Sequence, residues 1–311
     1  MIEISVVVPV YNESTNIKAF LERAEKVLNE LNKSYEIIFA LDPSKDDSEN
    51  VILEEIKRNK NIKLLLFSRK FGQPLSTMAG IHNCKGKYCV IIDVDLQDPP
   101  ELIKKLYEKI ITGYEVVYAK RKSRKGETFI KRIIAHLGYY LINKLSDIKI
   151  PRNAGDCRII SKKVVEQLKE LNESHGFLRG MVAFVGFKQS FIEYDRDLRY
   201  SGKSNYNKFF GSLTIGLNGL IGFSSRPLFL MSIIGFIIAL ISFFLGIWYL
   251  FQKISGINLT AGLTTTVILI SFFAGVQLLG LGLLGEYVGR IYDEVKKRPK
   301  YIVDKRVNFD E

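Results

Sequence analysis

The feature that most constrains this chain is a pair of long apolar runs near its C-terminal end. The first covers residues 228–251 and the second about residues 263–284, and the only side-chain charge between Pro227 and Gly285 is that of Lys253. Each run exceeds the roughly 20 residues that a helix needs to cross about 30 Å of hydrocarbon. Buried helices of a soluble core are the alternative, but such helices seldom run this long with every face apolar. We therefore predict a transmembrane hairpin over residues 227–285.

Charge is distributed unevenly around this hairpin. The 311 residues include 45 Lys and Arg against 33 Asp and Glu, a formal net charge of +12. Basic residues flank the hairpin on both sides, whereas the segment between the two runs carries only Lys253. The positive-inside bias then places both termini, including a basic tail over 286–311, in the cytoplasm. Net positive charge is compatible with nucleic acid, an anionic membrane or phosphorylated ligands, but basic residues that flank apolar surface disfavour nucleic acid.

Two stretches before the hairpin have the pattern of interfacial amphipathic helices. One lies near residues 129–145 and the other occupies the juxtamembrane segment 206–226, and each sets apolar residues beside basic or polar ones. This pattern is typical of helices that lie on a membrane surface. Helices of a soluble core are the alternative interpretation for both.

Residues 1–205 alternate strand and helix patterns. Apolar strands are expected at Ile4–Val10, Tyr35–Leu41, Ile62–Phe67, 88–93 and 114–119, with helices between them at 15–31, at Ser48–Arg58, after Pro74 and after Pro99 and Pro100. This order predicts an α/β domain built on a largely parallel sheet. The three cysteines (Cys84, Cys89 and Cys157) cannot form a fully paired disulfide framework, so we expect a reduced, cytosolic domain.

Acidic residues follow three of these strands. The first strand ends in V-P-V-Y-N-E over residues 8–13, the second in L-D-P-S over 41–44, and the fourth is followed by D-V-D-L-Q-D-P-P over 93–100. Ligands of such sheets bind at the carboxyl ends of strands. Carboxylate oxygens suit Mg²⁺ or Mn²⁺, which together with substrate phosphates would neutralise a diphosphate leaving group. A lone D-x-D usually belongs to a solvated loop, but three strand-end motifs in this order favour a site.

In these motifs the sequence resembles the family-2 glycosyltransferases, inverting enzymes of the Rossmann-like GT-A fold. Residues 8–13 match the opening V-P-x-Y-N-E of that family, and residues 93–97 match D-x-D-L-Q. The segment N-A-G-D-C-R over 153–158 and the hairpin narrow the resemblance to the polyprenyl-phosphate glycosyltransferases, which include bactoprenol glucosyltransferases and, more distantly, dolichol-phosphate mannose synthases. The pattern departs from the family at residues 41–44, where one of two usual acids is missing, and at residues 204–206, where S-N-Y replaces S-K-Y.

The resemblance implies roles for individual residues. One acid, Asp156, would lie near the transfer centre, either as a general base or as an organiser of the sugar, the metal or an arginine. Residues expected to bind the nucleotide sugar are Pro9, Tyr11, Glu13, Asp42, Asp93 and Arg121. The metal ligands would be Asp93, Asp95 and Gln97, and the phosphate-binding residues would be Arg196, Arg199 and Lys203.

The resemblance also implies an activity: transfer of one hexose, glucose from UDP-glucose, to undecaprenyl phosphate or another polyprenyl phosphate at the cytoplasmic face of a bacterial-type plasma membrane, by a homo-oligomer such as a tetramer. GDP-mannose or a different UDP-sugar is the alternative donor. A processive polysaccharide synthase is a further alternative, although the chain lacks the Q-x-x-R-W signature. A non-catalytic membrane scaffold or lipid transporter would leave the strand-end carboxylates unexplained.

Overall fold

The structure, a computed structural model, describes residues 2–122, 154–171, 177–197, 199–201, 221–222, 224–255 and 262–309. The chain divides into two compact units. The α/β unit comprises Met1–Asn143, Ile148–Gly219 and Pro299–Glu311, and the hairpin unit comprises Lys144–Asp147 and Leu220–Arg298. The interfacial helix expected near 129–145, and most of the one expected over 206–226, lie outside the described residues.

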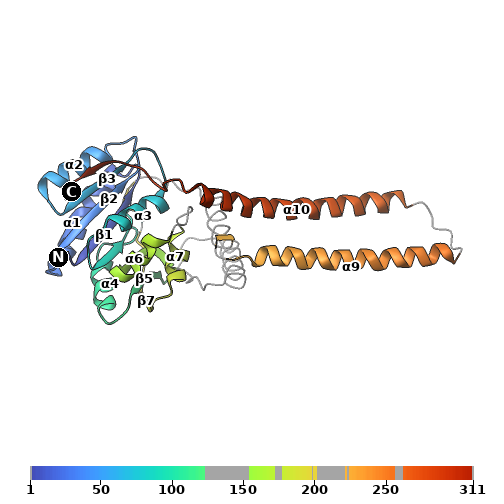
Figure 1. The fold of residues 1–311 in the computed structure, drawn as a ribbon. Coiled ribbons are helices and arrows are strands. Elements are labelled where there is room, and N and C mark those ends of the chain that lie inside the picture. Colours follow the sequence, from blue (N-terminus) through green and yellow to red (C-terminus); the bar gives the residue numbers. More distant parts are fainter. Residues whose placement is uncertain are drawn as a thin grey trace. The chain divides into compact units, whose positions relative to one another are not determined.

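The α/β unit is built on one mixed sheet, shown in Figure 1. Its strands stand in the order β7-β5-β6-β4-β1-β2-β3-β8. The neighbours β3, β2, β1 and β4 are mutually parallel, as are β5 and β7, whereas β6 and β8 run antiparallel to their neighbours. The strand bounds are β1 Ile4–Val10, β2 Tyr35–Leu41, β3 Ile62–Phe67, β4 Tyr88–Ile91, β5 Val116–Arg121, β6 Ala154–Ser161, β7 Gln189–Tyr194 and β8 Val303–Val307.

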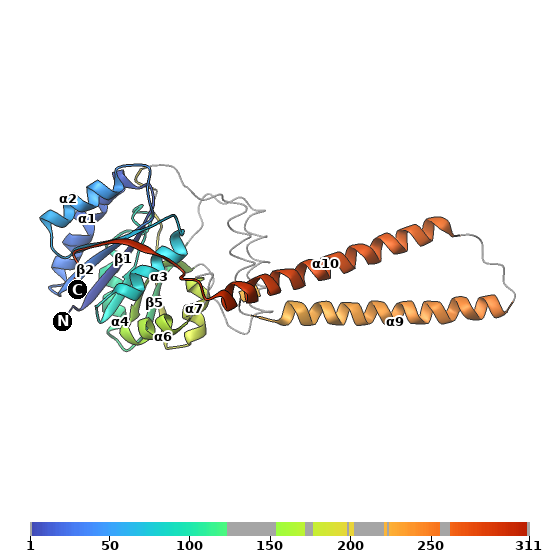
Figure 2. The same ribbon diagram turned by 45° about the horizontal axis from the view of Figure 1, so that its top comes forward.

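Helices cover both faces of this sheet (Figure 2). The helices α1, α2 and α4 pack together on one face, and α3, α6 and α7 on the other. Pro74 lies in the first turn of α3, where its missing N–H costs no intrahelical hydrogen bond. The bounds are α1 Ser14–Glu30, α2 Ser48–Arg58, α3 Gln73–Asn83, α4 Leu102–Ile110, α6 Lys162–Glu170 and α7 Leu178–Val185.

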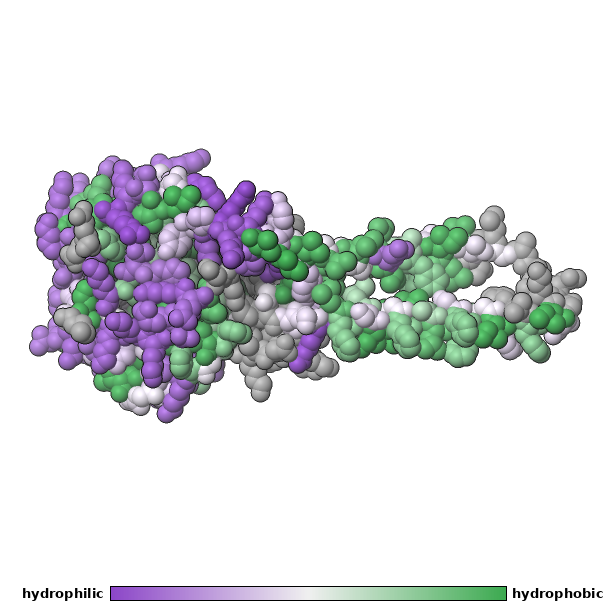
Figure 3. All heavy atoms as spheres, viewed as in Figure 1, coloured by the Kyte–Doolittle hydropathy of each residue, from purple (hydrophilic) through white to green (hydrophobic). Residues whose placement is uncertain are grey.

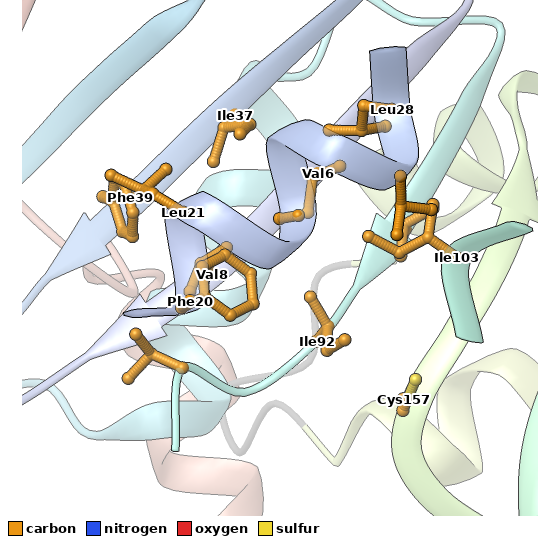
Figure 4. Close-up of a cluster of buried hydrophobic side chains, with 14 of the residues drawn as sticks. Val6, Val8, Phe20, Leu21, Leu28, Ile37, Phe39, Ile92, Ile103 and Cys157 are labelled. Atoms are coloured by element: carbon orange, nitrogen blue, oxygen red, sulfur yellow. The ribbon is translucent and has the colours of Figure 1, made fainter. Parts of the chain in front are cut away.

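The main hydrophobic core lies between the sheet and α1 (Figure 4). Phe20 of α1 meets Phe39 of β2 edge-to-face, with ring centroids 6.4 Å apart. Strand β1 is buried along its whole length, which is why its sequence is a continuous apolar run rather than an alternating one. This packing holds the carboxyl ends of the central strands at fixed positions.

The expectation of a largely parallel sheet is confirmed, because β1, β2, β3, β4, β5 and β7 point the same way and, among the described strands, only β6 and β8 run against them. Strand β6 lies between β4 and β5 and pairs with both in the antiparallel sense. The prediction rested on alternating strand and helix patterns, and that rule does not anticipate a later strand inserted between two earlier ones. The insertion matters for function because it brings the start of β6 to the carboxyl end of β4.

The segment that follows the hairpin also joins the α/β unit. We predicted a basic tail over 286–311, but residues 303–307 form β8, which pairs with β3. Just before this strand, the Tyr301 ring packs against Phe67, and its hydroxyl lies 3.1 Å from Nδ1 of His82. The Lys300 ammonium donates a hydrogen bond to the carbonyl of Leu171. The tail is therefore an integral edge of the sheet.

The hairpin unit contains the two long apolar helices, α9 (Arg226–Ile254) and α10 (Leu263–Lys296). Both are long and apolar enough to cross a membrane, and their side chains are mostly hydrophobic and exposed (Figure 3). At 1.5 Å per residue, the 34 residues of α10 extend about 50 Å, more than the roughly 30 Å of a hydrocarbon core. The predicted span of 263–284 therefore continues into a polar helical end that carries Arg290 and Glu294.

Gly80 tests the packing of α3 on β1. A Cβ at this position would overlap the Cγ1 atom of Val7. We expect Gly80→Ala to lower the free energy of unfolding by about 1–3 kcal/mol, because overpacking forces side chains or backbone to shift. Thermal unfolding of the purified protein measures the loss. The double variant Gly80→Ala/Val7→Ala should recover part of it, and a double variant less stable than Gly80→Ala would contradict the assigned clash.

Candidate active site

The carboxyl ends of the central strands lie together at one end of the sheet, and the loops that follow them carry polar side chains. Strands β1, β2 and β4 are parallel neighbours, so the loops after Val10, Leu41 and Ile91 leave the sheet on the same side. Strand β6 is antiparallel to β4 and therefore begins on that side, and β5 and β7 end there. We call the following residues the strand-end site: Glu13, Asp42, Asp93, Asp95, Gln97, Asp98, Arg121, Asp156, Arg179, Arg196 and Arg199.

The loop after β4 holds two carboxylates in a tight turn. The Asp93 Oδ1 atom accepts a hydrogen bond from Gln73 Nε2 at 2.8 Å, and the Asp95 Oδ1 atom accepts one from the backbone N–H of Gln97 at 3.1 Å. Leu96, which lies between Asp95 and Gln97, has φ +61°, an uncommon left-handed conformation for a leucine. Burial raises the pKa of Asp93 well above its ordinary value, and the neighbouring carboxylates of Asp156, Asp98 and Asp95 raise it further. Positive charge placed here would favour the ionised form.

Arg199 supplies positive charge to Asp95, the other carboxylate of this loop. Its guanidinium forms ion pairs with Glu13, at the end of β1, and with Asp95, where Nη1 lies 3.3 Å from Oδ2. The loop that carries it is fastened to the loop after β4, because the backbone N–H of Asp197 donates to the carbonyl of Gln97 at 3.1 Å. Burial raises the pKa of Glu13, although the hydrogen bond and charge of Arg199 oppose this shift. The motifs after β1 and β4 are thus connected through one arginine.

Asp42 shapes a loop on the β2 side of the site. Its side chain is buried, and its carboxylate oxygens accept hydrogen bonds from the backbone N–H groups of Phe71 and Gly72 at 2.9 and 2.8 Å. Gly72 has φ +89°, which an L-residue rarely adopts. Lys70, in the same loop, places its ammonium 3.5 Å from the centre of the Tyr11 ring. Asp42 therefore fixes the loop that faces Tyr11, and its expected contact with the nucleoside stays a prediction.

Asp98 is the centre of a second network. It is buried, accepts a hydrogen bond from the Tyr194 hydroxyl, and lies 3.7 Å from Nε of Arg196. The Nε of Arg121, at the end of β5, donates to the same Tyr194 oxygen at 3.3 Å. A buried carboxylate therefore holds together the ends of β5 and β7 and the two arginines that follow them.

Asp156, near the start of β6, is paired with Arg179 of α7. Arg179 donates from Nε to Oδ1 at 2.8 Å and from Nη2 to Oδ2 at 3.1 Å, a two-bond pair. Arg158 lies beneath, donating to the carbonyls of Gly155 and Asp156. Burial by itself would raise the pKa of Asp156, but the charges of Arg179, Arg158 and Arg121 outweigh it and lower the pKa to about 2. Asp156 is therefore ionised at neutral pH.

The structure brings most of the residues predicted from sequence to this one edge. Pro9 differs from the other predicted residues because it lies within β1 rather than in a loop. It pairs with Ala40, one residue before the end of the strand. Lys203 lies outside the described residues. Sequence reasoning gave no role to Asp98, Tyr194 or Arg179. Asp98 follows the D-x-D-L-Q motif directly and was recognisable there, whereas Arg179 lies in a helix without any motif.

The donor set fits a divalent cation that arrives with a diphosphate. Asp93 and Asp95 offer hard carboxylate oxygens, and the raised pKa of Asp93 indicates that a nearby positive charge would be stabilising. Within the part of the chain that the structure describes, no group of three or more His, Cys, Asp or Glu side chains could hold a metal by itself. One or two carboxylates completed by substrate phosphates is the usual pattern for Mg²⁺.

The fold is that of a GT-A glycosyltransferase. The model of the family described as glycosyl transferase family 2 matches residues 5–169, and the chain belongs to that family. It is 40% identical over 303 residues to an uncharacterized glycosyltransferase of Synechocystis sp., covering 97% of this chain and 95% of that protein. It is 39% identical over 303 residues to the SfII prophage-derived bactoprenol glucosyl transferase of Shigella flexneri, covering 97% and 98%. Glucosyl-3-phosphoglycerate synthase from Mycobacterium tuberculosis, solved with Mn²⁺, UDP and phosphoglyceric acid, aligns with a TM-score of 0.49 at 16% identity over 70% of this chain and 78% of that one.

The pair between Asp156 and Arg179 predicts a pH dependence of stability. The pKa of Asp156 falls from an ordinary 3.8 to about 2 on folding, so the stabilisation is complete above pH 4 and is lost as the pH falls toward 2. The difference in melting temperature between the wild type and Asp156→Asn should therefore be constant from pH 7 to 4 and shrink below pH 4. Glu54→Gln, which removes an exposed pair with Lys18, is the control and should differ little from the wild type throughout. A difference that grows below pH 4 would contradict the assignment.

Proposed function

We propose that this protein transfers a single glucose from UDP-glucose to a polyprenyl phosphate such as undecaprenyl phosphate, with inversion, at the cytoplasmic face of a bacterial-type plasma membrane. The observation that carries the proposal is the strand-end site, where acids suited to a metal-bound diphosphate stand beside several arginines suited to phosphate. Similarity to proteins named bactoprenol glucosyl transferase over nearly the whole chain supports the lipid acceptor. The same names favour glucose as the sugar.

The chemistry requires two anions to approach each other. The donor is a diphosphate and the acceptor is a phosphate, so their repulsion has to be offset by positive charge. Guanidinium groups do this well, because they stay protonated and form paired hydrogen bonds with phosphate oxygens. Arg121, Arg196 and Arg199 are each attached to a carboxylate or tyrosine of the site, which holds them in place before substrate binds. Such preorganisation is the main source of electrostatic catalysis.

A divalent cation, Mg²⁺ or Mn²⁺, belongs to the proposal. Asp93 and Asp95 would hold it, with Gln97 as a further ligand, and when bound it would neutralise the diphosphate that leaves. The remaining residues would act without it: Tyr11 and Glu13 border the nucleoside, and the loop fastened by Asp42 faces Tyr11.

A donor screen tests the activity directly. The purified full-length protein is incubated with undecaprenyl phosphate, Mg²⁺ or Mn²⁺, and in turn UDP-glucose, other UDP-sugars and GDP-mannose. We expect a glucosylated lipid that partitions into organic solvent and is identified by mass spectrometry. If only GDP-mannose or another UDP-sugar gives product, that sugar donor replaces UDP-glucose in the proposal. Donor hydrolysis that does not depend on the lipid, or no turnover at all, would overturn the lipid transferase.

Asp95→Asn tests the cation site. We expect it to lower turnover by about 100-fold or more, because a lost contact to developing charge typically costs 10²–10³ in kcat. Chelation by EDTA should abolish wild-type turnover, and added Mn²⁺ or Mg²⁺ should restore it. The control is Glu108→Gln, an exposed acid near the C-terminal end of α4, the end that leads to the start of β5, and it should retain wild-type turnover. Normal turnover of Asp95→Asn, with folding retained, would remove the metal role.

Topology follows from the same proposal. We infer that α9 and α10 cross the membrane as a hairpin, that both termini are cytoplasmic, and that the chain works as a homo-oligomer. The three native cysteines are buried, so the background for thiol labelling is low. An impermeant maleimide added to intact cells should label Ser255→Cys, at the end of α9, and should label Arg298→Cys only after permeabilisation. The reverse pattern would invert the topology.

A further inference from the structure

Arg179 and Asp156 form a two-bond ion pair in the strand-end site, and Arg158 and Arg121 lie close enough to act on the Asp156 carboxylate. The carboxylate comes from β6 and the guanidinium from α7, and both oxygens of Asp156 accept hydrogen bonds from Arg179. The two side chains stay partly open, with 38% exposure for Asp156 and 21% for Arg179. An exposed surface pair would have no reason to lie at the strand ends, and a purely structural pair is usually closed off. This pair is positioned at the site and accessible from it.

A base at Asp156 fits poorly with this arrangement. To take a proton, the carboxylate would have to give up the negative charge that strengthens its two hydrogen bonds from Arg179. Arg158, which is buried directly beneath, adds a second positive charge, with Nη2 at 3.8 Å from Oδ1. General bases work best with a pKa near the operating pH, whereas these guanidiniums favour the ionised carboxylate strongly. Asp156 is better suited to holding Arg179 than to accepting protons.

The proposed acceptor does not need a base. A phosphate oxygen that is already ionised attacks the anomeric carbon, the bond from that carbon to the diphosphate oxygen breaks, and the nucleoside diphosphate leaves with the electron pair. No proton is transferred in this step. What the incoming phosphate requires is a cationic partner on the side opposite the leaving group, because displacement with inversion is in line.

The strand order supplies that second side. Asp93 and Asp95 follow β4, whereas Asp156 begins the neighbouring β6 and Arg121 ends β5. A Cβ on Gly155 would lie 3.5 Å from Nη2 of Arg121, so Arg121 crosses the backbone directly beside Asp156. Arg179 and Arg121 therefore stand on the β6 and β5 side, where Arg179 pairs with Asp156 and Arg121 lies beside Asp98.

We propose that Arg179 binds the phosphate of the lipid acceptor and that Asp156 is a positioning residue for Arg179, not the general base. This inference rests on the proposed function, since it names the acceptor subsite of the same reaction. It assigns a binding role to a residue of α7 that no sequence motif marks. It also explains why an acid at the transfer centre carries two arginines.

The experiment compares Arg179→Gln, Arg179→Lys, Asp156→Asn and the double variant Arg179→Gln/Asp156→Asn in the full-length protein. Steady-state kinetics vary undecaprenyl phosphate and the sugar donor separately, and binding of undecaprenyl phosphate without donor is measured at equilibrium. We expect Arg179→Gln to raise the KM and Kd for the lipid by about 10- to 100-fold, the loss of charge-assisted hydrogen bonds, with a much smaller change in the donor KM. Arg179→Lys should recover part of the lipid affinity, because it keeps the charge but not the two-bond geometry.

The double variant separates positioning from base catalysis. If Asp156 acts through Arg179, then Asp156→Asn also weakens lipid binding, and the double variant is no worse than Arg179→Gln within about twofold, because coupled residues are not additive. If Asp156 is a base, Asp156→Asn lowers kcat by about 10²- to 10⁴-fold at unchanged lipid KM, and its effect multiplies that of Arg179→Gln. The second pattern overturns the inference.

Control variants and folding measurements distinguish failure of the proposed acceptor subsite from failure of the proposed reaction. Arg58→Gln removes an exposed arginine at the C-terminal end of α2 whose Nη2 donates to both carboxylate oxygens of Glu25, and it should leave both KM values unchanged. Circular dichroism and melting temperature report on folding of every variant. A wild type that transfers sugar, with Arg179→Gln binding the lipid normally, overturns this inference alone. The wild type could also turn over none of the sugar donors tested. If it then binds undecaprenyl phosphate and Arg179→Gln does not, the acceptor subsite stands while the proposed reaction fails.

Discussion

Repulsion among carboxylates at one sheet edge is the constraint on which the site depends. Parallel pairing of β1, β2 and β4 sends their acidic loops to the same side, and the antiparallel β6 adds Asp156 there. Left alone, these groups would raise one another's pKa and destabilise the fold. Four of them are paired with specific side-chain donors: Arg199 with Glu13 and Asp95, Arg196 and Tyr194 with Asp98, and Arg179 with Asp156. The arginines that stabilise these carboxylates are thereby held at the carboxyl ends of the strands.

This arrangement implies a division of labour between the two sides of the site. On the β4 side the acids stand close together, and burial and the neighbouring carboxylates raise the pKa of Asp93, an environment that suits the proposed cation. On the β5 and β6 side each acid already has its guanidinium, so an anion is the ligand that the remaining donors suit. A sugar held between the two sides would have its leaving group facing one and its nucleophile facing the other.

Much of the central fold was predictable because its causes are local. Continuous apolar runs predicted β1, β2 and β3 with their bounds, and the amphipathic pattern of Ser48–Arg58 predicted α2. The motif residues Asp93 and Asp95 could be assigned to the site because the carboxyl ends of parallel strands lie together, whereas Asp156 was assigned through the resemblance to the family alone. The places of β6 and β8 were not predictable, since strand order depends on contacts between segments far apart in the chain. Arg179 was not predicted from the sequence for the same reason, because only the folded arrangement of α7 and β6 brings it to Asp156.

The return of the chain to β3 has a consequence for how the protein is made. Until β8 pairs with it, β3 is an open edge with unsatisfied N–H and C=O groups, the kind of edge at which chains aggregate. β8 is encoded after both apolar helices, and ribosomes add roughly 5–20 residues per second. Synthesis of the 236 or so positions from β3 to β8 thus leaves that edge uncovered for about ten seconds or longer. During this interval the two apolar helices are synthesised. Because they precede β8 in the chain, they leave the ribosome before the strand that completes the sheet.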